Sequence, residues 1–217
     1  MNEARTAAGL PAFGKASGGT QVLPPSSSSL REITADTLWN EICQEITGGK
    51  GDRTESKKLD GTFAYYAGAK DCTAAVQYWK DGFSLFKNEL PPTYTTLGEP
   101  DVYTDRAVSF VALYNPKASP VASCAFVTCT TAGTFAAAAR RPSSPSLRRL
   151  QDAQTKTAVI CLTNPEALTD GEKPFKEDEW QKIVDAIVGP EESNGVSPIR
   201  PSLAVGLIAT IFASAHL

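Results

Sequence analysis

The C-terminal stretch, residues 193–217, constrains this chain most, because it separates the part that has to fold from a part that does not. It begins with three small residues, Ser193-Asn194-Gly195, continues with a short spacer that contains two prolines, and ends in largely apolar residues without a charged side chain. Small residues, a spacer of about 8–12 residues and an apolar tail of about 10–20 are typical of a glycosylphosphatidylinositol (GPI) attachment signal. We therefore predict a cleaved tail and a lipid anchor on Ser193, which places Gly195 two positions further on, with Asn194 as the second candidate.

Two other interpretations of this tail remain open. A transmembrane helix needs about 20 apolar residues and usually a basic segment after it, and the apolar residues 203–217 are fewer. A buried helix is the other alternative, although a stretch that is apolar on all sides has little polar surface to present to water. The GPI signal accounts best for the order of small residues, spacer and tail, and it predicts a protein on the outer leaflet of a plasma membrane.

Five cysteines give the second constraint, and they are Cys43, Cys72, Cys124, Cys129 and Cys161. None belongs to a Cys-x-x-Cys pair, and the one histidine, His216, lies in the tail. The sequence therefore predicts no metal site and no cofactor. In a chain that follows the secretory route, such cysteines form disulfide bonds. Because five is odd, one thiol is free, pairs with another chain, or lacks its partner.

The N-terminus does not fit a secreted chain as it stands. A GPI-anchored protein enters the secretory route through an apolar signal peptide, and residues 1–30 contain no such apolar segment. Residues 1–10 are instead typical of the end of a helix, which Gly9 closes. We expect that a signal peptide and a sixth cysteine precede Met1, and that this sixth cysteine is the missing disulfide partner.

Charge and length narrow the class of protein further. The net charge is −3 at pH 7, so the chain has no surplus of basic residues for phosphate contacts, and no nucleic acid partner is expected. The length suggests one domain, which we place at residues 1–192. Within it, residues 11–29 and 130–156 are rich in small and turn-forming residues and are predicted to be flexible loops. The four arginines of the second loop are either a solvated run or a docking patch for anions.

Apolar residues repeat at helical spacing in three segments, which we expect to be helices with one buried face. They are residues 35–47, residues 72–86 after the N-cap candidate Asp71, and residues 176–188, whose first turn carries three carboxylates. The aromatic side chains of the second helix are interpreted as core packing rather than as a cofactor site.

In the middle of the chain the apolar pattern changes to a period of two, which predicts strands. We expect strands at residues 108–114, 121–129 and 157–162, with a turn between the first two, and a further short strand at residues 62–66. Helices before and after such strands indicate an α+β fold, a three-layer α-β-α sandwich around a small antiparallel sheet.

The predicted strands limit how the cysteines can pair. Cys124 and Cys161 lie on neighbouring predicted strands, so a disulfide between them would cross-link the sheet. Side chains five residues apart on a strand point to opposite faces, so Cys129 should bond elsewhere, toward a helix. Cys72 and Cys43 are its candidates. Each bridge that closes a long loop would contribute about 2–4 kcal/mol.

Several segments together resemble the GPI-anchored surface antigens (SAG family) of Eimeria parasites. They are Cys72–Lys80, Val108–Pro116, the strand from Cys124 to Cys129, Ala158–Cys161 and Phe175–Ile183. The resemblance covers nearly the whole chain, and it implies six cysteines in three disulfides, a signal peptide, a GPI anchor and a place at the surface of an apicomplexan parasite. The sequence departs from the family in lacking the first cysteine and the signal peptide.

That family is regarded as a divergent relative of the CAP proteins (cysteine-rich secretory, antigen 5, pathogenesis-related), so the resemblance implies a CAP-like fold that disulfides stabilise. CAP proteins place a histidine of a metal-binding cleft where Val108 or its neighbours stand here, so their metal site is not carried over. The CAP equivalents of Cys124 and Cys161 are bonded to each other, which agrees with the pairing that the strands suggest.

These observations favour a GPI-anchored parasite surface antigen without catalytic activity. Its partners would be the membrane, through the lipid anchor, and a ligand on the host-cell surface, and its role would be attachment or immune exposure. No catalytic residue is predicted, because a nucleophilic triad needs a base and the chain upstream of Ser193 has no histidine. The alternative is a secreted or anchored CAP-like carrier of a lipid or other small ligand.

Overall fold

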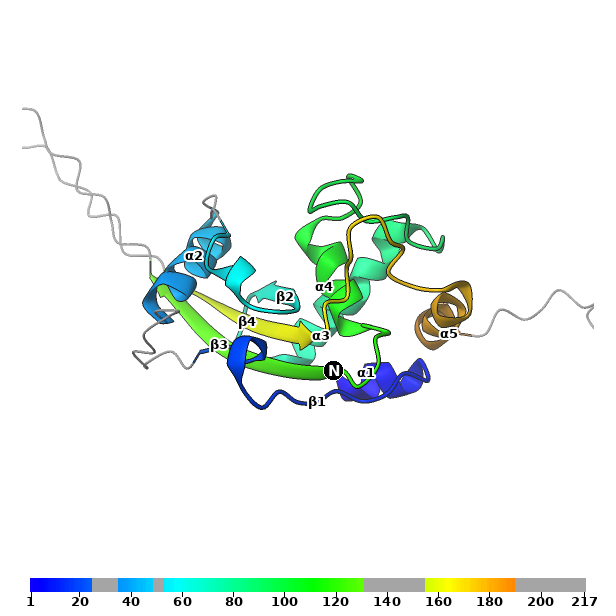
Figure 1. Cartoon of the computed structure of the whole chain (residues 1–217), viewed down its shortest axis with the longest axis horizontal. Coiled ribbons are helices and arrows are strands. Elements are labelled where there is room, and N and C mark those ends of the chain that lie inside the picture. The colour runs from blue at the N-terminus through cyan, green and yellow to red at the C-terminus, as the bar shows by residue number, and fades with distance from the viewer. Residues whose placement is uncertain (25–34, 49–52, 131–154, 190–217) are drawn as a thin grey trace, which may run out of the picture.

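The computed structural model describes residues 1–24, 35–48, 53–130 and 155–189, which are arranged around one small sheet (Figure 1). In these residues the sheet has four strands in the order β1-β3-β4-β2. The strands are β1 (Gly14–Lys15), β2 (Thr62–Ala67), β3 (Val121–Thr130) and β4 (Thr155–Asn164). β4 runs antiparallel to β2 and β3, as predicted, but β1 pairs with β3 in parallel, so the sheet is mixed.

The two faces of the sheet are both buried along β4. Ala158, Ile160 and Leu162 belong to one apolar cluster, whereas Val159 and Cys161 belong to another. Successive side chains on a strand point to opposite faces, so the two clusters lie on opposite sides of the sheet. A strand covered on both faces reads as a continuous apolar run, which is why the sequence identifies β4 readily.

One face carries α2 (Ala35–Thr47), which confirms the first predicted helix. Its side chains Leu38, Trp39 and Ile42 are buried against Ile160 and other residues of this face. Gly48 follows with a φ of +93°, a conformation that glycine adopts without steric cost, and closes the helix.

The opposite face carries α3 (Cys72–Lys80), which continues as the 3-10 helix η3 (Asp81–Phe86). The Asp71 carboxylate accepts hydrogen bonds from the Thr73 and Ala74 backbone N–H groups at 2.8 and 3.3 Å, so the predicted N-cap is confirmed. Trp79 of α3 and the side chains of Phe83 and Phe86 of η3 are buried and form core, as expected.

The strand predicted at residues 108–114 is wrong, because this segment belongs to the helix α4 (Asp105–Leu113). Thr104 caps it by accepting a hydrogen bond from the Ala107 N–H at 3.5 Å. Residues 109–114 are all buried, and a helix surrounded by core shows no polar face, so its periodicity cannot be told from that of a strand. The turn predicted between two strands instead joins α4 to β3.

The two predicted loops coincide only partly with the described residues. Residues 11–24 contain β1 and the 3-10 helix η1 (Gly19–Gln21), while residues 25–29 lie outside the described residues. The second predicted loop, with its four arginines, lies outside the described residues, except that its ends belong to β3 and β4. β1 was not predicted, because a strand of two residues is too short to show an apolar pattern.

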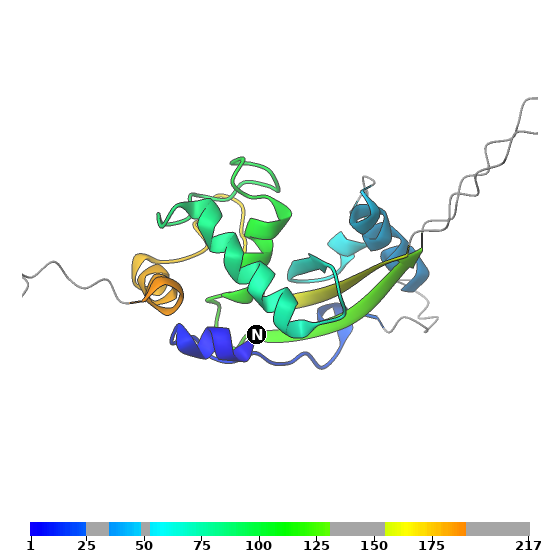
Figure 2. The ribbon, with the colours of Figure 1, turned by 180° about the vertical axis from the view of Figure 1, so that it is seen from behind.

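The helices α1 (Asn2–Ala7) and α5 (Glu177–Val188) complete the fold, and α5 confirms the last predicted helix. Figures 1 and 2 show both at the end of the molecule that holds α3 and α4, with α2 at the other end. Trp180 of α5 meets the rings of Phe83, Phe110 and Phe175 at centroid distances of 5.4, 6.1 and 5.9 Å. This aromatic cluster joins α5 to α4 and η3.

Arg5 ties α1 to the rest of the fold from a fully buried position. Its guanidinium donates hydrogen bonds to the carbonyl oxygens of Pro11, Leu113 and Asn115 at 2.7, 2.9 and 2.9 Å. The guanidinium also lies over the Phe13 ring, 4.0 Å from its centroid. Burial lowers the pKa of Arg5 to about 10, so the side chain stays charged at neutral pH.

Candidate functional site

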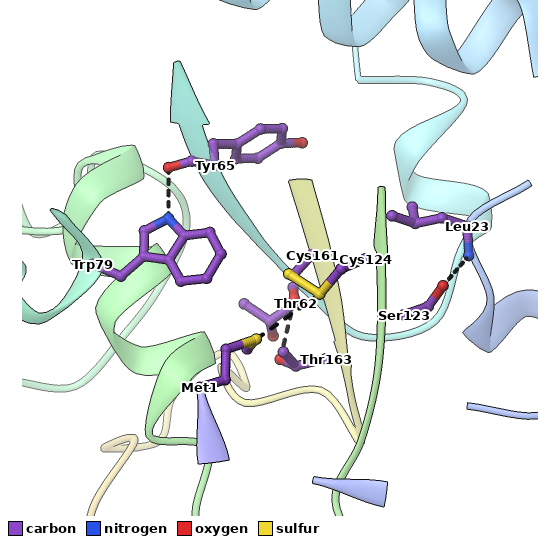
Figure 3. The surroundings of a disulfide bond; sticks show 9 residues. All are labelled: Met1, Leu23, Thr62, Tyr65, Trp79, Ser123, Cys124, Cys161 and Thr163. Carbon is purple, nitrogen blue, oxygen red and sulfur yellow. Dashed lines mark hydrogen bonds between the residues drawn. A yellow bond between two sulfur atoms is a disulfide. The ribbon is translucent and has the colours of Figure 1, made fainter. Parts of the chain in front are cut away.

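One disulfide crosses the middle of the sheet and joins Cys124 of β3 to Cys161 of β4 (Figure 3). The two residues are direct partners in the antiparallel register, with Cα atoms 4.1 Å apart. Cys161 is buried, and Cys124 is exposed with its sulfur 3.9 Å from the Met1 sulfur. This bond links the two longest strands on the face that carries α3 and α4.

A second disulfide joins Cys43 of α2 to Cys129 of β3, with Cα atoms 5.3 Å apart. Cys129 is buried in the cluster under α2, on the face of the sheet opposite to the Cys124–Cys161 bond. This agrees with the spacing of five residues between Cys124 and Cys129, which places their side chains on opposite faces. Of the two candidates for Cys129, Cys43 is therefore the partner in the structure. The bond closes a separation of 86 residues, for which chain entropy gives about 4–5 kcal/mol of stabilisation.

Cys72 is free and exposed at the first position of α3. That the partner of Cys72 lies upstream of Met1 stays a prediction.

β2 forms an outer edge of the sheet, and side chains of neighbouring helices cover the middle of this strand. The Tyr65 backbone N–H donates to Ser109 Oγ at 3.0 Å, and Trp79 Nε1 donates to the Tyr65 carbonyl at 2.8 Å. Figure 3 shows the Trp79 indole pointing at this carbonyl. An exposed strand edge is a template for pairing with another chain, so α3 and α4 remove that template at Tyr65.

An open cleft of about 600 Å³ lies next to the same strand edge. Its apolar wall comes from β2, from α4 and from the loop that precedes α4, and includes Phe63, Tyr65, Tyr94, Leu97 and Val108. Val108 thus lines a cleft with an apolar side chain. Pockets of about 300–1,000 Å³ with a few polar groups are typical of small-ligand sites.

At one end of the cleft, Arg53 is shared between two carboxylates. Its Nε lies 2.6 Å from Glu45 Oε1, and an η nitrogen lies 2.9 Å from Asp105 Oδ1. Burial alone would lower the pKa of Arg53, but the hydrogen bond and charge of Asp105 and the charge of Glu45 raise it. Burial raises the pKa of Glu45 against the opposing effect of Arg53. The charges at this end are therefore largely satisfied within the fold.

At the other end, Asp60 and Glu166 both line the cleft. The Thr20 hydroxyl donates to the Asp60 carboxylate, and no ion pair of Asp60 or Glu166 is present among the described residues. Burial, and then the negative charge of Asp60, raise the pKa of Glu166, while Lys117 lowers it. Lys57 also lines the cleft but forms no ion pair with either carboxylate among the described residues, so Asp60 and Glu166 can still accept a positively charged ligand group.

The groups that line the cleft can bind a ligand. Burial raises the pKa of Tyr65 and of Tyr94, so both phenols are neutral at pH 7 and offer hydroxyl groups. Within the described part of the chain, no cluster of three or more histidine, cysteine or acidic side chains could hold a metal ion. The sequence reasoning missed this cleft, because its residues come from distant segments that share no motif.

The predicted GPI attachment residues, Ser193 and Asn194, lie outside the described residues, as does the apolar tail. None of the helices that the structure describes has the length and apolar character to cross a membrane. The lipid anchor therefore stays a prediction from the sequence.

Comparison with known proteins places the chain in a family. Residues 1–200 match the family model of the sporozoite surface antigen (SAG) protein domain. The chain is also 49% identical over 226 residues to the sporulated oocyst TA4 antigen of Eimeria tenella, across 99% of this chain and 85% of that antigen. This chain belongs to the SAG surface antigen family. Membership implies a location at the parasite cell surface, and it confirms the resemblance found in the sequence.

No solved structure matches this SAG protein. The described residues show a mixed α and β fold with a small four-stranded sheet and two disulfides. A CAP-like sandwich stays a prediction.

Proposed function

We propose that this SAG protein is a GPI-anchored, non-catalytic antigen on the outer leaflet of the parasite plasma membrane, where it serves host-cell attachment or immune exposure. The observation that carries the proposal is the order of small residues, spacer and apolar tail in residues 193–217. Family membership and the two disulfides support it, since disulfides persist in oxidising extracellular surroundings. α5 ends at Val188, so a lipid on Ser193 or Asn194 would hold the fold close to the membrane.

Phosphatidylinositol-specific phospholipase C applied to intact parasites tests the anchor. We expect surface labelling of the protein to disappear from the cells and the protein to appear in the medium. A matched variant that ends at Ser202 lacks the apolar tail and should be secreted without treatment. Labelling that survives the phospholipase on intact cells would argue for a transmembrane or peripheral attachment instead.

The cleft favours a second candidate function, the carriage or recognition of a small ligand. Its volume of about 600 Å³ and its wall of tyrosine and aliphatic side chains suit such a ligand. Solvent extraction of the purified, disulfide-bonded chain followed by mass spectrometry tests this function for lipids. A lipid recovered in stoichiometric amount would support carriage, and a clean extract would remove lipid from the candidates.

A further inference from the structure

The backbone of Phe63 offers unused hydrogen-bonding groups at the edge of the sheet. In an antiparallel pair, residues alternate between bonding the neighbouring strand and pointing away from it. The backbone N–H and C=O groups of Tyr65 point away from β4, because they form hydrogen bonds with Ser109 and Trp79. Phe63, two residues earlier on β2, therefore presents its N–H and C=O groups at the same edge. No described residue forms a hydrogen bond with either group.

This unblocked part of the edge opens into the cleft. Phe63 is one of the lining residues, and the facing wall is formed by Tyr94, Leu97 and Val108. A ligand that fills the cleft lies alongside the Phe63 backbone and can both accept a hydrogen bond from its N–H and donate one to its C=O. Only a ligand with paired donor and acceptor groups in an extended arrangement satisfies both.

The charges of the cleft select among such ligands. Asp105 is paired with Arg53 at 2.9 Å, so it has little left for a ligand. Asp60 and Glu166 at the other end have no ion-pair partner among the described residues, although both line the cleft, and Lys57, which lines it too, pairs with neither. A cation placed between them would relieve the repulsion that the two carboxylates exert on each other.

We propose that the cleft binds an extended peptide segment that pairs with the backbone of Phe63 and places a lysine or arginine side chain between Asp60 and Glu166. Addition of a strand to an exposed sheet edge is a general mode of peptide recognition, in which backbone bonds give affinity and side-chain pockets give specificity. This inference names a ligand class for the cleft. It rests on the cleft having a binding role, and it is independent of the GPI anchor.

Other ligand classes fit less well. A lipid chain would cover Asp60 and Glu166 without offering them a partner, and buried charges without partners are strongly unfavourable. A phosphate-bearing ligand would bring negative charge to an end of the cleft that is already negative. A peptide supplies the hydrogen-bonding groups that Phe63 lacks and the positive charge that the carboxylates lack.

The test uses the complete disulfide-bonded chain and three capped pentapeptides of sequence Thr-Val-X-Val-Thr. In the first X is lysine, in the second X is glutamate, and the third is the lysine peptide with N-methyl groups on both valines, which removes their backbone donors. Calorimetry measures affinity, and a nitrogen-15 NMR titration follows the Phe63 amide. We expect binding of the lysine peptide, with the Phe63 amide among the most strongly shifted signals.

Protein variants separate the two parts of the proposal. Glu166→Gln removes one carboxylate and should weaken the lysine peptide about tenfold, the equivalent of one charged hydrogen bond. Glu89→Gln removes an exposed carboxylate that does not line the cleft and should leave the affinity unchanged. Thr96→Trp fills the cleft from its exposed rim and should abolish binding.

The proposal is overturned if the glutamate peptide or the N-methylated peptide binds as tightly as the lysine peptide, or if none binds at millimolar concentration. Binding that persists in Thr96→Trp places the peptide outside the cleft and overturns it too. A lipid recovered by solvent extraction would overturn the peptide assignment while leaving a carrier function intact, so the two failures are distinguishable.

Discussion

Substitution of Arg5 by methionine should strongly destabilise the fold. Methionine keeps the apolar stem but leaves the carbonyl oxygens of Leu113 and Asn115 without their donors, and both of these hydrogen bonds are buried. The Pro11 carbonyl, whose bond is only partly buried, can turn to water. Each buried acceptor left unsatisfied costs about 1–3 kcal/mol. Two such acceptors give an expected loss of about 2–6 kcal/mol, and the relief from no longer burying a charge places the loss in the lower part of that range.

Urea unfolding with the disulfides intact measures this loss from the midpoint and slope of the transition. Arg106→Met is the matched control, because Arg106 also lies over an aromatic ring, 4.7 Å from the Tyr78 centroid, and pairs with Asp81 at 3.3 Å. Its side chain is 35% exposed, so its removal should cost about 1 kcal/mol or less. Equal losses in the two variants would refute the role assigned to the buried carbonyl contacts of Arg5.

Three further predictions follow from the disulfides and the cleft. Replacing both Cys43 and Cys129 by serine should lower the free energy of unfolding by about 4–5 kcal/mol, which urea titration measures, because a separation of 86 residues loses its cross-link. Iodoacetamide should modify Cys72 in the native chain without denaturant, and a peptide map that shows Cys72 unreacted would contradict its exposure. Burial and the charge of Asp60 raise the pKa of Glu166 above its ordinary value of 4.5, so the folded chain holds this proton more tightly than the unfolded chain. The stability that this proton contributes is present at low pH and is lost as the pH rises through the raised pKa. Thermal melts of Glu166→Gln should therefore match the parent below pH 4.5 and exceed it above, and a constant difference across that range would contradict the shift.

Local patterns were enough to predict much of the fold. The apolar face of residues 35–47 and the acidic first turn of residues 176–188 each predict a helix that the structure contains. The cap at Asp71 could be predicted because its carboxylate acts within three residues of itself. The strands β3 and β4 were recognisable because β3 has an alternating segment and β4 has a continuous apolar run at residues 158–162. In each case the deciding interaction is local, or the burial leaves an alternating or continuous apolar run that the sequence itself shows.

The errors arise where tertiary contacts decide the structure. The second half of α4, residues 109–113, is buried on every side, so Phe110 and Val111 give no sign of helical period, and the signal that remains is the capping residue Thr104. β1 exists because Gly14 and Lys15 meet Val121 and Ala122 of β3, more than a hundred residues later.

The candidate site could be predicted only in part. The argument from opposite strand faces separates Cys124 from Cys129, but it does not choose between Cys43 and Cys72, because that choice depends on which helix lies above Cys129. Arg5 sits in a short helix of small residues, and nothing in its neighbours signals that its partners are carbonyl oxygens from distant segments. The cleft likewise assembles side chains from segments that no spacing rule connects.

The identity of the mature C-terminus tests the central claim most directly. Protein released from parasite membranes by phospholipase C can be digested, and its C-terminal peptide identified by mass spectrometry. The GPI proposal predicts a peptide that ends at Ser193 or Asn194 and carries a glycan with ethanolamine. An unmodified peptide that ends at Leu217 would contradict it, and the apolar tail would then belong to a buried helix or a membrane segment.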